Sequence, residues 1–490
     1  MQLAFKNITS IARHRLILTR VGSMIQISKI ITLFSICVFI TLRNSAQTPS
    51  QKPVPNDWFA KDPATDSVAG INLEKAYQLL KGRKSKTVIV AVLDNGVDIL
   101  HEDLVNIIWT NKKEIPGNGI DDDHNGYADD VHGWNFRGAK NGTIIENEQA
   151  GALQFYSRWH KKFENADTTL LSTEDKKQFS IYQKAKQEYL QKLKGTDDAD
   201  TQFAYNITYN SSSLIENDGP DFNNKYYGSP YFKLSPNLTH GTHVAGIIGA
   251  QRNNNKGIDG IADNILIMPV VASTAVGDER DKDVANAIFY AVNNGAKIIN
   301  ISFSKSLSPD KKFVDEAVKY AEEKNVLIVH VAGNDGVDID SPENYHYPVP
   351  IYMDGNRAGN FITVGWNRPL FDYRLAHPNS GYGRLNVDLF APGSDIYSTV
   401  PDNGYDFKSG SSMSAPMVSG VAALLLSYFP ALSAKQVKEI LLTSTYKPHQ
   451  LVNKPQTKIP VQFASLSLSG GIVNAYNAVK MAIEWTTRNH

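Results

Sequence analysis

Residues 87–96 read TVIVAVLDNG, and this stretch decides the fold. Its first seven residues, Thr87 to Leu93, are apolar or β-branched, which predicts a strand buried on both faces of a parallel sheet. Asp94 follows directly, so its carboxylate is expected at the carboxyl edge of the sheet, where open α/β sheets hold their ligands. Aspartate in such a position is also a common turn former.

Apolar runs of the same kind recur along the chain and alternate with helical patterns. The other strand candidates are Ile265 to Val271, Lys297 to Ser302, Val326 to Val331, Phe361 to Val364 and Val387 to Phe390. The helical patterns are Asp283 to Asn294, Asp310 to Lys324, Ser412 to Tyr428, Ser433 to Leu442 and Ile472 to Trp485. Because strands and helices alternate, the sequence predicts an α/β fold with a parallel sheet.

A long segment at about residues 104–235 interrupts this alternation. It is rich in Gly, Asn, Asp and Lys and lacks sheet-like runs, so we expect a large, partly helical insertion. Ser172 and Asp175 form a possible capping pair for a helix that runs to Lys194. Its apolar stripe consists of Tyr182, Ala185, Tyr189 and Leu193. A second helical stretch, residues 149–163, is expected to pack on that stripe as a hairpin.

Composition indicates a folded, soluble body. Of the 490 residues, 42% are apolar and 20% charged, which excludes a disordered, collagen-like or multi-span membrane protein. Residues 1–46 contain six Lys or Arg and no acid, so the rest of the chain carries 44 basic and 50 acidic residues, a net charge of −6. Nothing in this balance suggests a nucleic-acid partner.

The amino-terminal segment predicts export. Ile30 to Leu42 is an uncharged run of 13 residues, shorter than the about 20 that a membrane span needs. We interpret residues 1–46 as a leader and signal peptide with cleavage after Ala46, an uncleaved anchor being the alternative. Export would be to the periplasm or the medium, with membrane contact only through the signal segment. The polar, Pro-containing residues 47–69 are expected to be a linker to a domain at 70–490.

Cys37 is the only cysteine, and it lies inside the apolar run. A lipid anchor there is disfavoured, because Ile36 is bulky where such a site needs a small residue. A mature chain without cysteine has no disulfides, so a bound metal is an alternative means of stabilising the fold.

Two further blocks carry residues suited to acyl transfer, which needs a nucleophile, a base, a group that orients the base, and donors for the oxyanion. His240 opens the block HGTHVAG, and Ser412 lies in SGSSMSAP at residues 409–416. Both stand where a loop meets a helix, and the N–H groups of a helix start favour negative charge beside the serine hydroxyl. Taken alone, such a His is usually a cap or a core residue, and such a Ser an N-cap.

Asn334 follows the predicted strand Val326 to Val331 and carries an amide N–H₂ that is able to reach an oxyanion. The pair Asn-Asp after Gly is also an ordinary turn. A turn, a helix cap or a packed core residue would each explain one of these residues. None of these explanations accounts for Asp94, His240, Ser412 and Asn334 occurring together in one chain.

The three blocks, in the order Asp, His, Ser, resemble those of the subtilisin-like serine proteases, or subtilases. The His block matches in every position, the Asp block matches as Asp94-Asn95-Gly96, and the Ser block matches with conservative changes at Ser411 and Ser414. The resemblance covers roughly residues 70–485 apart from the insertion. It implies a three-layer α/β parallel-sheet fold.

The resemblance also implies a role for each of the four residues. Ser412 would be the nucleophile, His240 the general base and then acid, and Asp94 the carboxylate that fixes the imidazole tautomer. Asn334 and the Ser412 backbone N–H would form the oxyanion hole.

A substrate-binding edge follows from the same resemblance. An extended peptide would pair along residues 300–304 by β-augmentation. The expected contacts are Asn300, Ser302, Phe303, Ser304 and Gly333. The family usually has Gly where Ser304 stands, so a side chain there would narrow the cleft.

These implications describe an exported serine endopeptidase that hydrolyses protein or peptide substrates through an acyl-enzyme, without a catalytic cofactor. Two alternatives stay open: a catalytically silent peptide-binding scaffold, and a peptide ligase that resolves the acyl-enzyme with an amine. Loss of a triad member would favour the scaffold, and the sequence retains all three. Water is the default nucleophile in an open cleft, which favours hydrolysis over ligation.

The acidic stretch DDDHNGYADD at residues 121–130 predicts a structural calcium site. Alternating carboxylates, an amide and a Gly for a sharp turn are the features of oxygen-rich calcium loops. The candidate ligands are Asp121, Asp123, Asn125, Tyr127, Asp129 and Asp130. The plain alternative is a solvated acidic turn.

Overall fold

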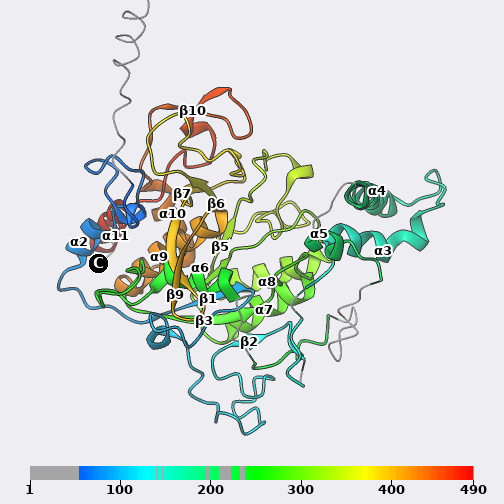
Figure 1. The fold of residues 1–490 in the computed structure, drawn as a ribbon, viewed down its shortest axis with the longest axis horizontal. Helices are drawn as coiled ribbons and strands as arrows, with labels where there is room; N and C mark the ends of the chain where they lie inside the picture. Colours follow the sequence, from blue (N-terminus) through cyan, green and yellow to red (C-terminus); the bar gives the residue numbers. More distant parts are fainter. Residues whose placement is uncertain are drawn as a thin grey trace, which may run out of the picture. The chain divides into compact units, whose positions relative to one another are not determined.

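The computed structural model describes residues 54–139, 141–145, 147–194, 199–208, 222–231 and 238–488 (Figure 1). From residue 56 onward, the described residues form one compact unit. Its centre is a sheet of seven strands whose neighbouring pairs are all parallel. In spatial order the strands are β2 (Trp134–Asn135), β3 (Ile265–Val271), β1 (Val88–Asp94), β4 (Ile298–Ile301), β5 (Leu327–Val331), β6 (Phe361–Asn367) and β7 (Leu389–Pro392).

Strand β1 lies inside the sheet, as its apolar sequence predicts. Side chains alternate between the two faces of a strand, and Ala91 and Leu93 join the core that contains α7 (Asp281–Asn293) and α8 (Lys311–Glu323). The alternate residues Val90 and Val92 are equally buried and face the opposite layer.

The opposite layer is formed by α6 (Thr239–Gly249) and α9 (Ser411–Tyr428), which contact each other and the strands. Further helices of this unit are α2 (Leu73–Leu80), α10 (Ala434–Thr443) and α11 (Ala475–Arg488), which pack with α9 or with one another. The predicted three-layer α/β architecture is therefore confirmed.

Helix α9 is a core helix. Within the described residues it alone has the length and apolar composition of a membrane span, but 83% of that apolar window is buried inside the fold. The candidate signal segment at residues 1–46, with Cys37 and Ala46, lies outside the described residues.

The insertion contains the predicted helical hairpin, α3 (Gly151–Phe163) and α4 (Thr173–Leu193), followed by the short α5 (Ala199–Ala204). Ser172 caps α4, because its hydroxyl accepts the N–H of Asp175 at 3.0 Å. Tyr182, Ala185 and Tyr189 are buried between the two helices, as predicted.

Two details of the insertion differ from the prediction. Leu193 is 55% exposed, because α4 extends beyond its partner there and leaves that side chain without a packing surface. The insertion also contributes a strand, since β2 pairs with β3 beside Val270 and Val271. Two residues are too few to produce an apolar run in the sequence.

The segment 47–69 is not a free linker over its whole length. Trp58 and Phe59 are 1% and 2% exposed, in a short 3₁₀ helix, η1 (Trp58–Ala60). These two aromatic side chains attach residues 56–69 to the folded unit. The structure also has two small antiparallel sheets outside the main one, β8 (Ile396–Val400) with β9 (Gly404–Lys408), and β10 (Leu451–Asn453) with β11 (Pro460–Gln462).

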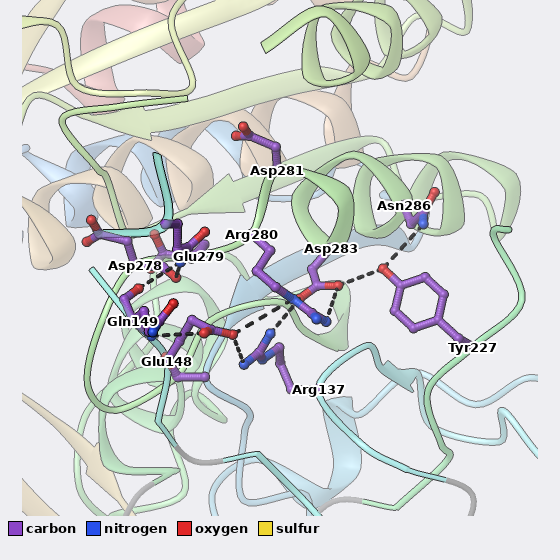
Figure 2. Close-up of polar contacts among 12 residues, drawn as sticks. Arg137, Glu148, Gln149, Tyr227, Asp278, Glu279, Arg280, Asp281, Asp283 and Asn286 are labelled. Atoms are coloured by element: carbon purple, nitrogen blue, oxygen red, sulfur yellow. Dashed lines mark hydrogen bonds and ion pairs between the residues drawn. The ribbon is translucent and has the colours of Figure 1, made fainter. Parts of the chain in front are cut away.

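A buried ion network fastens the insertion to α7 (Figure 2). Arg137 lies 2.9 Å from Asp283 and 2.7 Å from Glu148, and Arg280 lies 2.8 Å from Asp283. The Tyr227 hydroxyl donates a hydrogen bond of 2.6 Å to the same Asp283 carboxylate. Burial alone raises the pKa of Asp283, but the two arginines outweigh it and hold that pKa below its usual range. The network thus fixes insertion residues beside the loop that precedes α7.

Candidate active site

Asp94 and His240 form a hydrogen-bonded pair at the carboxyl edge of the sheet. Asp94 is the last residue of β1 and His240 the second residue of α6, and Asp94 Oδ1 lies 2.8 Å from His240 Nδ1. The carboxylate is 1% exposed and the imidazole 36% exposed. One ring nitrogen is therefore held inside the fold, while the ring itself reaches the surface.

The glycine after His240 makes this approach possible. A Cβ at Gly241 would lie 2.1 Å from the carbonyl oxygen of Gly96 and 3.1 Å from the Asp94 Cβ. No other residue fits there without separating α6 from the end of β1. The small residues of the HGTHVAG block thus have a packing function.

The electrostatics of the two histidines in this block differ. Burial lowers the pKa of His240, but the charge of Asp94 and its hydrogen bond outweigh burial, so that pKa is raised above 6.5. His243 is fully buried and bonds backbone carbonyls of the β8–β9 hairpin, and burial lowers its pKa to about 3. His240 is the one suited to gain and lose a proton near neutral pH.

Ser412 lies in the first turn of α9, next to the end of β4. Its hydroxyl donates a hydrogen bond of 2.8 Å to the carbonyl oxygen of Ser302. Leu93 and Ile301 are register partners on adjacent parallel strands, so Ser302 is the residue beside Asp94. Ser412 is therefore at the same sheet edge as the Asp94–His240 pair, although its hydroxyl is bonded to Ser302 and not to His240.

Asn334 is exposed and lies beside the start of α9. Its Oδ1 accepts hydrogen bonds from the Ser411 N–H at 2.9 Å and the Ser411 hydroxyl at 3.1 Å. Because the oxygen is engaged with Ser411, the N–H₂ of the amide points the other way. The Ser412 N–H is one of the first-turn donors that lack an intrahelical acceptor.

Only part of the predicted substrate-binding edge is accessible at the surface. Asn300 Nδ2 donates to Ser302 Oγ at 2.9 Å, Ser302 Oγ donates to the Ser412 carbonyl at 3.0 Å, and the Ser419 hydroxyl donates to Asn300 Oδ1 at 2.8 Å. These buried side chains join β4 to α9 and are not available to a peptide. Asn300 also lies inside the sheet, because it pairs with residues of β1 and of β5. No sequence pattern indicates this orientation of the Asn300 and Ser302 side chains, because both residues belong to a predicted strand.

The remaining predicted substrate contacts lie nearer the surface. Phe303 is partly buried, and its carbonyl accepts the His330 ring N–H at 2.9 Å. Ser304 is partly exposed and lines a cavity together with Asn334. Gly333 has a φ of +91°, and a Cβ there would lie 1.7 Å from His346 Nδ1, so the imidazole packs directly on the glycine backbone.

The acidic loop at 121–130 divides into two sets of residues. One set forms a cluster, in which carboxylate oxygens of Glu114, Asp121 and Asp123 all lie within 4.8 Å of one another. Such a group offers the oxygen ligands that calcium prefers. Glu114 was missing from the sequence prediction, because it lies outside the loop motif.

The other predicted ligands shape the loop. Asn125 donates to Asp130 at 3.0 Å, and Asp130 also accepts the Tyr290 hydroxyl at 2.7 Å. Asp129 accepts backbone N–H groups of residues 117 and 119 at 2.7 and 2.9 Å, and the Tyr127 hydroxyl donates to a backbone carbonyl at 3.2 Å. Burial raises the pKa of Asp130 to about 6, more than its hydrogen bonds lower it. The side chains of Asn125, Tyr127, Asp129 and Asp130 are thus outside the carboxylate cluster.

A parallel α/β sheet that holds a carboxylate–histidine pair beside a helix-start serine is the arrangement of a serine hydrolase class. Residues 85–464 match the model of the Subtilase family (Peptidase S8), and the chain belongs to this family.

Several characterised proteins are similar to this chain. A thermophilic serine proteinase of Bacillus sp. (strain AK1) is 34% identical over 248 residues, which is 48% of this chain and 57% of the relative. Thermitase of Thermoactinomyces vulgaris is 38% identical over 188 residues, 38% of this chain and 61% of the relative. Subtilisin-like protease 1 of Plasmodium falciparum (isolate 3D7) is 26% identical over 424 residues, 84% of this chain and 46% of the relative. The chain thus spans less than two thirds of the length of each of these relatives.

Proposed function

We propose that this protein is a serine endopeptidase in which Ser412, His240 and Asp94 act together. The observation that carries the proposal is the 2.8 Å pair of Asp94 and His240 at the sheet edge where Ser412 lies in the first turn of α9. Family membership supports it, since the matching relatives are named as proteases.

The chemistry requires one local movement. Rotation of Ser412 about its Cα–Cβ bond would release the hydroxyl from the Ser302 carbonyl and offer it to His240 Nε2. His240 would then accept the serine proton as the oxygen attacks the peptide carbonyl, and later donate a proton to the leaving amine. Asp94 would hold Nδ1 in its protonated form and stabilise the imidazolium.

Charge on the attacked carbonyl oxygen would be stabilised by two donors. These are the Asn334 side-chain N–H₂ and the Ser412 backbone N–H, the first fixed by the two bonds from Ser411. The helix start of α9 adds a favourable dipole.

Substrates would be proteins or peptides bound in extended form along residues 302–304. The Ser304 backbone makes no hydrogen bond within the part of the chain that the structure describes, so it is available for pairing with a peptide. Casein hydrolysis and covalent labelling by a fluorophosphonate, compared between the wild-type protein and Ser412→Ala, test the proposal.

The pH profile gives a second test. Because only neutral imidazole accepts the serine proton, kcat/KM should rise as His240 loses its proton. The Asp94 carboxylate raises the pKa of His240, so the midpoint should lie above 6.5. Initial rates of a fluorogenic peptide, measured between about pH 5 and pH 9, check this. A profile that falls with pH contradicts the assignment of His240 as base, whereas a midpoint lower than that of an ordinary histidine contradicts only the upward shift of its pKa by Asp94.

We also propose that Glu114, Asp121 and Asp123 hold a structural calcium ion. Their clustered carboxylates repel one another, and the one cationic side chain that the structure describes beside them is the exposed Lys113, 3.8 Å from Asp123. The hydrogen bond between Asn125 and Asp130 keeps the loop in shape around the cluster. Calcium would supply charge compensation and no catalytic step.

Removal of calcium should destabilise the protein. A ligand at about 100 times its Kd adds about 2.7 kcal/mol of stability, so excess EGTA should lower the Tm of a unit of this size by about 3 °C. Differential scanning fluorimetry with and without EGTA measures this. Asp123→Asn should remove the response to EGTA, whereas Asp66→Asn, in an acidic turn outside the cluster, should keep it. An unchanged Tm of the wild-type protein in EGTA would rule out a stabilising calcium ion.

Export to the periplasm or the medium remains part of the proposal. It rests on the 13-residue uncharged run Ile30 to Leu42 behind a basic leader. The division into a leader at 1–46, an attachment segment and a catalytic domain to residue 490 is proposed on the same basis.

A further inference from the structure

The loop before α7 borders a cavity of about 600 Å³ beside the candidate active site. Asp278 of this loop lines it, as do Ser304 and Asn334 on the substrate side. The opposite wall comes from the insertion, through Glu188 and Asp200 among others. The cavity thus lies between the peptide-binding edge and the insertion helices.

The lining is acidic. Its carboxylates are Glu188, Asp200, Asp278 and Asp335, and its lysines are Lys192 and Lys305. Lys305 is paired with Asp281 at 2.8 Å, and it also donates to the backbone carbonyl of Glu279 and lowers the pKa of Asp278. Its charge is shared among these groups and therefore offsets the acidic lining only in part. Asp335 has a cationic neighbour when His346, at 3.0 Å, is protonated. Four carboxylates and two lysines leave the lining net acidic.

Glu279 adds a buried carboxyl group behind this lining. It is 8% exposed, and its Oε2 has no hydrogen-bond partner among the described residues. Burial first, and then the charge of Asp278, raise the pKa of Glu279 to about 8, and the more distant charge of Asp94 acts in the same direction. With a pKa of about 8, this carboxyl group is mainly protonated at neutral pH while the cavity is empty.

The nearby arginines are committed elsewhere. Figure 2 shows Asp278 and Glu279 beside the network in which Arg137 binds Glu148 and Asp283. Arg280 also pairs with Asp283, at 2.8 Å. Burial disfavours the charged form of Glu279, whose Oε2 has no hydrogen-bond partner among the described residues, and a cation brought by a ligand would favour that form.

We propose, on the basis of the peptidase function above, that this cavity binds a Lys or Arg side chain of the substrate near the scissile bond. Glu279 and Asp278 are the specificity-determining residues. The ligand class is therefore a basic peptide, and the insertion that supplies the outer wall confines the cationic side chain.

The test is a peptide library in which each position on both sides of the scissile bond carries Lys, Arg, Gln, Leu or Glu in turn. With the wild-type protein, one position should show a kcat/KM at least about tenfold higher for Lys or Arg than for Gln, as expected for a charge-assisted contact. Glu279→Gln keeps the shape and removes the carboxyl group that a bound cation would ionise, and it should reduce that ratio at least about tenfold. Glu74→Gln, the same change at a site outside the cavity, should leave the ratio unaltered.

Asp278→Asn provides a second variant in case Glu279→Gln does not fold. The new amide oxygen is still able to accept the Gly151 N–H that Asp278 binds at 2.7 Å. The ratio should again fall. Casein hydrolysis with no preference for a basic residue, or a preference that both variants retain, overturns the inference and leaves the peptidase function intact. Failure to cleave casein or to react with a fluorophosphonate refutes the peptidase function itself.

Discussion

Ser412→Ala is expected to lower kcat by about 10⁶ and to abolish fluorophosphonate labelling. The hydroxyl is the only part of Ser412 that is able to form an acyl-enzyme, so no covalent intermediate remains when it is removed. The variant should fold, because its lost hydrogen bond to the Ser302 carbonyl is a single contact worth about 1 kcal/mol. Active-site titration and the hydrolysis rate of a fluorogenic peptide measure the effect.

Ser427→Ala is the matched control, since Ser427 is a buried serine at the far end of the same helix. It should retain labelling and activity. If Ser412→Ala still reacts with the probe, another residue is the nucleophile. If the wild-type protein is also inert while it binds peptides, the silent scaffold replaces the enzyme.

The sequence predicts the strand and the helices that carry the site, because a short local pattern specifies each of them. The apolar run before Asp94 specifies a buried parallel strand, and a parallel strand places its last residue at the ligand-binding edge. The HGTHVAG block specifies a helix that packs closely, and Gly241 shows why small residues are required. Asp94 and His240 are 146 positions apart in the sequence, yet the fold brings them within 2.8 Å.

Side-chain direction is the part that sequence patterns leave undetermined. Asn300 and Ser302 read as strand positions next to the substrate, but their side chains bond α9, because helix and strand approach closely enough there to need polar partners. Glu114 joins the acidic cluster through a chain reversal that no spacing rule describes. Nor does the sequence show that the carboxyl group of Glu279 lacks an arginine partner, because this depends on which acids the nearby arginines bind in the folded protein.

The same limit applies to the insertion. Its helices could be predicted from the stripe of Tyr182, Ala185 and Tyr189, because that stripe is periodic. Its position beside the cavity could not be predicted, since it depends on the ion network of Arg137 with Glu148 and Asp283, residues that come from three separate segments. Contacts between such segments leave no periodic pattern in the sequence.

Asp94→Asn should lower kcat by about 10⁴ while the fold is retained. The amide is nearly the same size as the carboxylate, but its N–H₂ would donate to His240 Nδ1 and shift the ring proton to Nε2. An imidazole in that tautomer does not accept the serine proton. The charge that raises the pKa of His240 is lost as well, and burial, which lowers that pKa, remains. The residual activity should therefore have its midpoint at a lower pH than the wild-type protein.

Asp98→Asn is the appropriate control, because Asp98 is a buried aspartate in the loop directly after β1 and accepts hydrogen bonds from backbone N–H groups, not from His240. Its pH midpoint should equal that of the wild-type protein, although some stability is lost. A full pH profile for each variant, with the rate and the midpoint fitted separately, distinguishes the two effects of Asp94. A large loss of rate with an unchanged midpoint would mean that Asp94 orients the ring without setting its charge. An unchanged rate would remove Asp94 from the mechanism, since the 2.8 Å contact would then be structural only.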